Sequence, residues 1–429
     1  MNNISFIINV GKNNLEYLKL LLKSVKENLC YDNHEILIFV DRDNEGIVDY
    51  LNEQKTEFKD LRYITHKMPG GYVGYQLNIN ILVKYAKHDI ISYLQSDMIV
   101  CKEYDRIILE ELEENCVLSA TRIEPPLHPP SDKTFTMNFG LTPSEFRWYD
   151  FLNYAEQVKS DKTIGYFFAP FTFHRNVWEK VNGHDSWFRR SREDSDILQK
   201  FIHNGIMIKQ TFKANVYHFT CVSSRGVNWY NTNDESVKHT NTLQQIADNL
   251  EMIKFIRKWG WFNHGESPLK KWNVDLFIKN SNNIDKHKMF LIEPFFSKVW
   301  LDDEKVTNDL VEMNNDEAIP NTLIGISEPE WNEAKKFYNT TDFSSIYKYG
   351  IQSEFPNILI SVDASNQNWF SELQELTSNN IHQIIETMNE GEEYRYDNIS
   401  IVINKKITNL NHNLQLKNPE FDYTLLEVH

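Results

Sequence analysis

Apolar and polar positions alternate along the first part of the chain in blocks whose lengths fit strands and helices. The apolar runs 4–10 and 35–40 are rich in β-branched residues, and residues 15–29 carry apolar side chains at helical spacing. A further helical pattern starts at residue 47, and residues 61–65 form a third apolar run. Strands that alternate with helices in this way predict a parallel sheet of the α/β class.

The same alternation continues toward residue 220. It predicts helices over residues 78–87 and 196–203 and strands over residues 89–94, 167–173 and 214–220. The stretch from Arg122 to Asp132 is rich in proline, which neither a helix nor a central strand tolerates. It therefore predicts a surface loop, for which a lid is one interpretation.

The character of the chain changes near residue 265, where Ser-Pro, Lys-Lys and an Asn-rich stretch follow one another. We therefore predict one domain over residues 1–265 and a smaller α/β or α+β domain over residues 266–429. Within the second domain the expected strands are residues 289–292, 358–362 and 399–402. No motif there carries chemistry, so the sequence assigns this domain no role.

Bulk composition narrows the function classes. With 41% hydrophobic residues the chain can form sizeable cores, and its net charge of −16 argues against coating nucleic acid or an anionic membrane. No apolar run reaches the roughly 18 residues that span a bilayer, and the start lacks a secretory pattern, so we expect a cytoplasmic protein. The four cysteines form no C-x-x-C pair, which leaves zinc and dithiol chemistry without support.

Two residues that follow predicted strands are candidates for a metal site. Asp97 comes directly after a buried strand, where ligands of open α/β sheets bind, although an Asp that caps a turn is an equal alternative. His218 lies at the end of the last predicted strand and could supply an imidazole ligand, but a His between two aromatic residues is more often part of a core.

An acidic cluster follows Arg189, Arg190 and Arg192. A carboxylate of Glu193 or Asp194 could act as a general base, kept ionised by the neighbouring guanidinium groups. The alternative is a solvated helix start, because acidic side chains are favourable at the positive end of the helix dipole.

The order of these motifs resembles the GT-A fold, in particular the large second family of inverting glycosyltransferases, over roughly residues 4–220. The matching motifs are Gly70-Gly71, Ile79-Asn80, Lys87-His88-Asp89, Leu94-Gln95-Ser96-Asp97, and Asn182-Gly183-His184-Asp185 before Glu193-Asp194-Ser195-Asp196. The resemblance implies a Rossmann-like domain with a mixed, mostly parallel sheet that binds a nucleoside-diphosphate sugar.

The resemblance also implies roles for particular residues. Asp194 would be the general base, with Glu193 as the next candidate, and Asp97 with His218 would hold a divalent cation. Because an imidazole ligand suits Mn²⁺ better than Mg²⁺, Mn²⁺ is the expected ion. The residues implied in donor binding are Asn9, Val10, Asp41, Asp43, Gly70, Gly71, Asn80, Gln95, Ser96 and Asp97.

The expected partners are a UDP-sugar donor, with a GDP-sugar as the alternative, and the hydroxyl group of a glycan or glycoconjugate acceptor. Two positions depart from the family pattern, because Gln95 replaces the first acid of the Asp-x-Asp motif and Ile79 replaces an Arg. A catalytically inactive carbohydrate-binding or scaffold relative therefore stays open as an alternative. A nucleotidyltransferase is a lesser one, since only Gly11-Lys12 follows the first strand in place of a Gly-rich phosphate loop.

Overall fold

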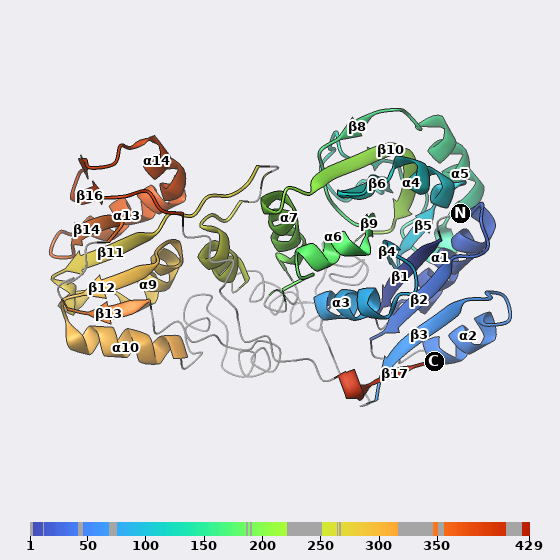
Figure 1. Ribbon diagram of the computed structural model, residues 1–429, viewed down its shortest axis with the longest axis horizontal. Helices are drawn as coiled ribbons and strands as arrows, with labels where there is room; N and C mark the ends of the chain where they lie inside the picture. Colours follow the sequence, from blue (N-terminus) through green and yellow to red (C-terminus); the bar gives the residue numbers. More distant parts are fainter. Residues whose placement is uncertain are drawn as a thin grey trace. The chain divides into compact units, whose positions relative to one another are not determined.

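The computed structural model describes residues 3–11, 13–41, 46–67, 75–185, 188, 191–220, 251–263, 265, 267–315, 346–350, 356–408 and 423–429. The chain divides into two compact units (Figure 1). Unit 1 consists of residues 1–186, 193–241 and 419–429, and unit 2 of residues 187–192 and 242–418. The assignment of functional domains to residues 1–265 and 266–429 stays a prediction.

The described part of unit 1 alternates strands and helices along the chain. Its strands are β1 (Ile4–Val10), β2 (Glu35–Val40), β3 (Leu61–His66), β4 (Ile90–Gln95), β5 (Met98–Val100), β6 (Cys116–Glu124), β7 (Phe135–Thr136), β8 (Thr163–Ile164), β9 (Phe171–His174), β10 (Met207–His218) and β17 (Leu426–Val428). Its helices are α1 (Leu15–Asn28), α2 (Ile47–Gln54), α3 (Tyr75–Tyr85), α4 (Tyr104–Glu111), η1 (Pro143–Glu145), α5 (Trp148–Gln157), α6 (Arg175–Lys180), α7 (Glu193–His203) and η4 (Tyr423–Leu425).

These strands form one mixed sheet in the order β17-β3-β2-β1-β4-β9-β6-β10-β5, with β7 beside β6 and β8 beside β10. Strands β3, β2, β1 and β4 run parallel to one another, and β9 lies antiparallel between β4 and β6. The chain steps from β1 outward to β2 and β3 and then returns to the other side of β1 for β4. Such a reversal of strand order is where open α/β sheets bind their ligands, beyond the carboxyl ends of the strands.

The sheet of unit 1 has an apolar core on each face. Successive side chains of a strand point to opposite faces, so Phe6 and Ile8 belong to one core and Ile7 to the other. Helices α1, α2, α4 and α5 pack in the first core, and α3, α6 and α7 pack in the second. The unit is thus an α/β layer structure with a mixed sheet, as predicted.

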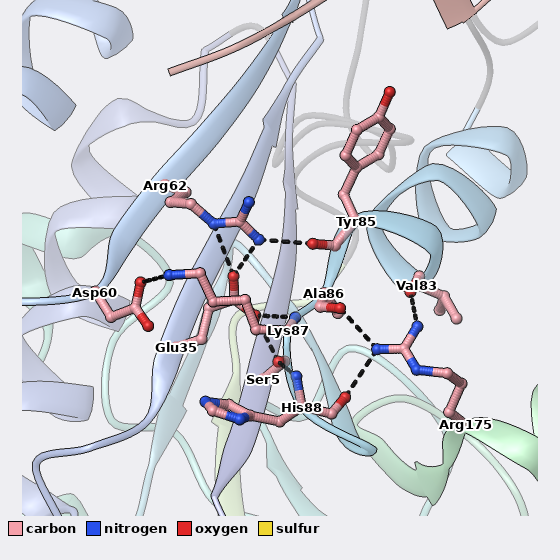
Figure 2. A network of polar contacts seen from close by, with 10 residues as sticks. All are labelled: Ser5, Glu35, Asp60, Arg62, Val83, Tyr85, Ala86, Lys87, His88 and Arg175. Carbon is pink, nitrogen blue, oxygen red and sulfur yellow. Dashed lines mark hydrogen bonds and ion pairs between the residues drawn. The ribbon is translucent and has the colours of Figure 1, made fainter.

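A buried carboxylate ties together the amino ends of the parallel strands (Figure 2). Glu35, which is 0% exposed, accepts hydrogen bonds from Ser5 Oγ at 2.5 Å, from Arg62 Nε at 2.9 Å and from the Lys87 amide at 2.7 Å. The His88 amide in turn donates to Ser5 Oγ at 3.0 Å. This network fixes the start of β4 against β1, β2 and β3, at the sheet edge opposite to the carboxyl ends.

The segment 423–429 returns to unit 1 and pairs with the edge strand β3. Strand β17 runs antiparallel to β3, and the amide of Lys67 donates to the carbonyl of Leu425 at 2.8 Å. The ring of His429 stacks on Tyr63 with 4.6 Å between ring centroids. Strand β17, which lies far along the sequence, therefore covers the backbone N–H and C=O groups that the edge strand β3 would otherwise expose.

Unit 2 contains a second sheet. Its elements are β11 (Val274–Lys279), η2 (Ser281–Asn283), α9 (Lys286–Ile292), η3 (Glu293–Phe295), β12 (Lys298–Leu301), α10 (Glu304–Asn315), β13 (Tyr347–Tyr349), β14 (Ile358–Asp363), α13 (Trp369–Ser378), α14 (Ile381–Thr387), β15 (Glu393–Tyr396) and β16 (Ile399–Ile403). The strand order among the described residues is β13-β12-β11-β14-β16-β15, with β13, β12, β11 and β14 parallel and β16 antiparallel. Residues 251–259 are helical and contribute Phe255 and Trp259 to its single core cluster.

Several predicted boundaries agree with the structure and a few do not. Residues 289–292, predicted as a strand, belong to helix α9, because an apolar run of four residues carries no period that separates a strand from a buried helix turn. The predicted loop from Arg122 starts too early, since β6 continues to Glu124. The strand predicted over residues 167–173 is confined to Phe171–His174.

Candidate active site

The carboxyl ends of β1, β2 and β4 bring the first candidate residues together. Asn9 pairs with Gln95 across β1 and β4, and the Asp41 amide donates to the Val10 carbonyl at 2.8 Å. Asn78 of α3, which is 0% exposed, donates from Nδ2 to Asn9 Oδ1 at 3.1 Å. Sequence reasoning missed Asn78, although its place in the helix that follows the third strand could have indicated it.

Asp97 and His218 come together because β5 pairs antiparallel with β10. Met98 is the partner of His218 in this pairing, so Asp97 lies one residue before it, and the Phe219 amide donates to the Asp97 carbonyl at 3.1 Å. Both side chains are buried, and His218 Nε2 lies 3.7 Å from Asp97 Oδ2. The flanking Tyr217 and Phe219 are core residues that point to the opposite face of the strand.

Glu124, the last residue of β6, contacts the other nitrogen of the same imidazole. Its Oε1 lies 2.7 Å from His218 Nδ1, and Arg122 Nη1 lies 3.4 Å from the same oxygen. Burial raises the pKa of the Glu124 carboxyl, but the hydrogen bond from His218 and the charge of Arg122 outweigh it and lower the pKa to about 2. Sequence reasoning missed Glu124 because it assigned this residue to the proline-rich loop.

These contacts fix the electrostatics of the pair. An ionised carboxylate only accepts hydrogen bonds, so Nδ1 of His218 carries the hydrogen that faces Glu124. In a neutral ring Nε2 then holds a lone pair, and it faces the carboxylate of Asp97. A divalent cation between these two acceptors would bind to both of them. Burial and the charge of Asp97 also raise the pKa of the nearby Tyr17 hydroxyl.

An independent comparison with protein families now identifies this part of the chain. A model of "Glycosyl transferase family 2" matches residues 6–180, which hold β1 to β9 and the Asp97 turn. Residues 6–180 are therefore similar to glycosyl transferase family 2. The match agrees with the order of the motifs, which predicted a glycosyltransferase of this family.

Solved glycosyltransferases are similar to the chain at low identity. TarS of S. aureus shares 11% identity with a TM-score of 0.41, over 92% of this chain and 57% of that one. GalNAc-T7 with UDP, GalNAc and Mn²⁺ shares 12% identity (TM-score 0.39; 60% of this chain, 51% of that one). A mannosyltransferase from Pyrobaculum calidifontis in complex with GDP-Man and Mn²⁺ shares 10% (TM-score 0.38; 59% and 64%). The chain spans about half to two thirds of the length of these three proteins. No curated protein sequence matches it significantly.

The other residues that the sequence predicted in donor binding lie in different parts of unit 1 or outside the described residues. Ser96 Oγ accepts a hydrogen bond from Asn14 Nδ2 at 3.3 Å, which joins the turn before Asp97 to the start of α1. Asp43, Gly70 and Gly71 lie outside the described residues. Within the described ranges no group of three or more His, Cys, Asp or Glu side chains is arranged to hold a metal ion.

Asn80 has a structural role in unit 1. Its Nδ2 donates to the His184 carbonyl and its Oδ1 accepts from the His184 amide, both at 2.9 Å. A Cβ at Gly183, whose φ is +58°, would lie 2.4 Å from Asn80 Oδ1. These two hydrogen bonds hold the Asn-Gly-His-Asp motif against α3. They give Asn80 and Gly183 a structural role that needs no ligand.

The candidate bases lie in the first turn of α7. Helix α7 begins at Glu193, and its first turn also contains Asp194 and Asp196. Asp194 is exposed, Glu193 is half-buried and Asp196 is buried. This position fits both a base that an acceptor can reach and an acidic residue placed at the positive end of the helix dipole.

In the described part of the chain no helix is long and apolar enough to cross a membrane.

Proposed function

We propose that this chain transfers a sugar, with inversion, from a nucleoside-diphosphate sugar to a hydroxyl group of a glycan or glycoconjugate, with the help of a divalent cation. The observation that carries the proposal is the convergence of Asp97 Oδ2 and His218 Nε2 at 3.7 Å, beside the reversal of strand order between β1 and β4. The match of residues 6–180 to the family model supports the same chemistry.

The donor would lie along the carboxyl ends of β1, β2 and β4. Asn9, Val10 and Asp41 line the part of this edge where the base and ribose would bind, with UDP favoured over GDP. Gln95 and Ser96 lead from β4 to Asp97, where the diphosphate would lie. Asp43, Gly70 and Gly71 remain predicted contacts.

The pair Asp97 and His218 fits a divalent cation. Metal bonds to carboxylate oxygen and imidazole nitrogen are each about 2.1 Å long, so one ion reaches both atoms when they are less than about 4.2 Å apart. The separation of 3.7 Å meets this limit. A cation bound there supplies positive charge to the departing diphosphate, and the imidazole ligand favours Mn²⁺ over Mg²⁺.

Asp194 is the proposed general base. Its carboxylate would take the proton of the acceptor hydroxyl while that oxygen bonds to the anomeric carbon from the face opposite to the leaving group. The bond from the anomeric carbon to the diphosphate breaks, and the nucleoside diphosphate leaves with both electrons. Asp194 is exposed and therefore open to an acceptor, and Glu193 beside it is the second candidate.

One residue favours a second candidate function. Gln95 occupies the place of the first acid of the family motif, so a relative that binds sugars without turnover is the alternative. It predicts sugar binding that Mn²⁺ does not change and no release of nucleoside diphosphate.

Calorimetric titration with UDP, GDP, TDP and CDP, each with and without Mn²⁺, tests the donor site. We expect one nucleotide to bind in a Mn²⁺-dependent way and to lose this dependence in Asp97→Ala and His218→Ala. Asp89→Ala is the matched control, because Asp89 is an exposed carboxylate directly before β4, at the opposite edge of the sheet. If no nucleotide binds under either condition, the proposal is wrong. Near-normal transfer by Asp194→Asn would remove Asp194 from the role of base.

A further inference from the structure

We infer that Glu124 is the positioning residue of this site, because its carboxylate holds the ring of His218 with Nε2 aimed at Asp97. Glu124 Oε1 lies 2.7 Å from Nδ1, and Asp97 Oδ2 lies 3.7 Å from Nε2, on the other side of the ring. The inference rests on the proposed function, since it assigns Glu124 a part in cation binding there.

The hydrogen bond selects one tautomer of the imidazole. A carboxylate offers acceptors only, so the ring must place its hydrogen on Nδ1 to satisfy Glu124. A neutral imidazole has a single N–H, which leaves the lone pair on Nε2, and this is the form that ligates a metal. Without Glu124 the ring can carry its hydrogen on Nε2, where it would point an N–H at Asp97 and turn a cation away.

Glu124 is itself held by its surroundings. Glu124 pairs with Thr136 of β7 in the sheet, and the Met137 amide donates to the Glu124 carbonyl at 2.9 Å. The guanidinium group of Arg122 contacts the Glu124 carboxylate, donates to the Ala169 carbonyl and lies 4.6 Å from the ring centroid of Phe168. A carboxylate fixed in this way can fix the ring that donates to it.

Arg122 also balances the charge of Glu124. The two side chains together are neutral, so Glu124 orients His218 without adding net negative charge near the diphosphate. The net charge that these three side chains give to the site is therefore that of Asp97 alone. A carboxylate that ligated the ion directly would not need this compensation, which separates the role of Glu124 from that of Asp97.

The test uses Glu124→Leu, which removes the acceptor, and Glu124→Gln, which keeps an acceptor oxygen without charge. The first readout is the tautomer of His218, measured by ¹⁵N NMR of the metal-free full chain with labelled histidine. The signals of His218 are identified by their loss in His218→Gln. We expect Nδ1–H in the wild type and in Glu124→Gln, and Nε2–H in Glu124→Leu.

The second readout is the dissociation constant of Mn²⁺, measured by electron paramagnetic resonance of the free ion with and without the nucleoside diphosphate that binds in the calorimetric titration. Loss of a group that orients a metal ligand costs about 10- to 100-fold in affinity, so we expect this loss for Glu124→Leu and less than tenfold for Glu124→Gln. Asp105→Asn is the matched control. Asp105 also accepts from a histidine, His34 at 3.0 Å, and both are buried at the opposite edge of the sheet, so Mn²⁺ affinity should not change.

The outcomes separate this inference from the proposed function. An Nε2–H tautomer in the wild type, or wild-type Mn²⁺ affinity in Glu124→Leu, would overturn the role of Glu124. An equal loss of Mn²⁺ affinity in Asp105→Asn would do so as well, because general destabilisation would then explain the effect. If the tautomer changes as expected but the wild type binds no Mn²⁺ with or without the nucleoside diphosphate, Glu124 still orients His218 and the cation part of the proposed function fails.

Discussion

One buried histidine should make unit 2 less stable in mild acid, because its ring binds a proton only when the unit unfolds. His382 is 1% exposed, its Nδ1 accepts from the Trp272 amide at 3.0 Å, and its Nε2 donates to the Phe295 carbonyl at 3.1 Å. A second ring hydrogen on Nδ1 would face the N–H of Trp272. Burial, helped by the charge of Lys271, lowers the pKa of His382 from 6.5 to about 3.

The shift in the pKa of His382 gives the sign and the size of the change in the free energy of unfolding. Because the folded pKa lies below the unfolded one, the unfolded chain binds a proton that the folded chain does not, and unfolding becomes easier as pH falls from 6.5 toward 3. At pH 5 the folded ring is still neutral, so the cost depends only on the unfolded pKa and amounts to about 2 kcal/mol relative to pH 7. Burial likewise lowers the pKa of Lys271 to about 7, so the destabilising effect of Lys271 changes little between pH 5 and pH 7 and decreases only above pH 7.

The assay is urea unfolding of the full chain at pH 7 and pH 5, read by pulsed hydrogen–deuterium labelling of β11 and β14. His382→Gln removes the titrating group, so its unfolding free energy should change about 2 kcal/mol less between the two pH values than that of the wild type. His128→Gln, an exposed histidine of unit 1, should behave as the wild type in these strands. An equal pH dependence in His382→Gln and wild type would refute the reasoning.

Three further changes test the fold around the site. Glu35→Gln breaks the buried network at the amino ends of the strands and should cost about 3 kcal/mol in urea unfolding of unit 1; a loss below about 1 kcal/mol would contradict it. Gly183→Ala should cost about 3 kcal/mol, because its Cβ meets Asn80, whereas Gly205→Ala, also at positive φ but with nothing within 4 Å, should cost about 1 kcal/mol. Deletion of residues 423–429 should speed hydrogen exchange of the outward amides of β3 at least tenfold, while those of β2 stay protected.

The sequence predicted the elements that carry the site better than the contacts within it. Strands β1 and β2 span the predicted residues because long β-branched runs have one interpretation in an α/β pattern. The place of Asp97 just beyond β4 could be predicted because this residue follows such a run. The contact between Glu124 and His218 could not be predicted, because it depends on β6 and β10 being neighbours in the sheet. This is a pairing between distant segments that no local pattern encodes. The return of β17 to β3 is of the same kind.

The structure also bears on what Gln95 means for the proposed chemistry. Gln95 ends β4 opposite Asn9, so the missing acid leaves Asp97 as the carboxylate that faces His218. One carboxylate and one neutral imidazole give a divalent cation only part of the negative charge and few of the ligands that it needs. The oxygens of a bound diphosphate supply the remaining negative charge and the remaining ligands. Under the proposed function the cation should therefore bind weakly alone and tightly with the nucleotide, and Gln95 by itself is no argument for an inactive protein. The titrations with and without Mn²⁺ separate these cases, because an inactive relative would show no coupling between ion and nucleotide.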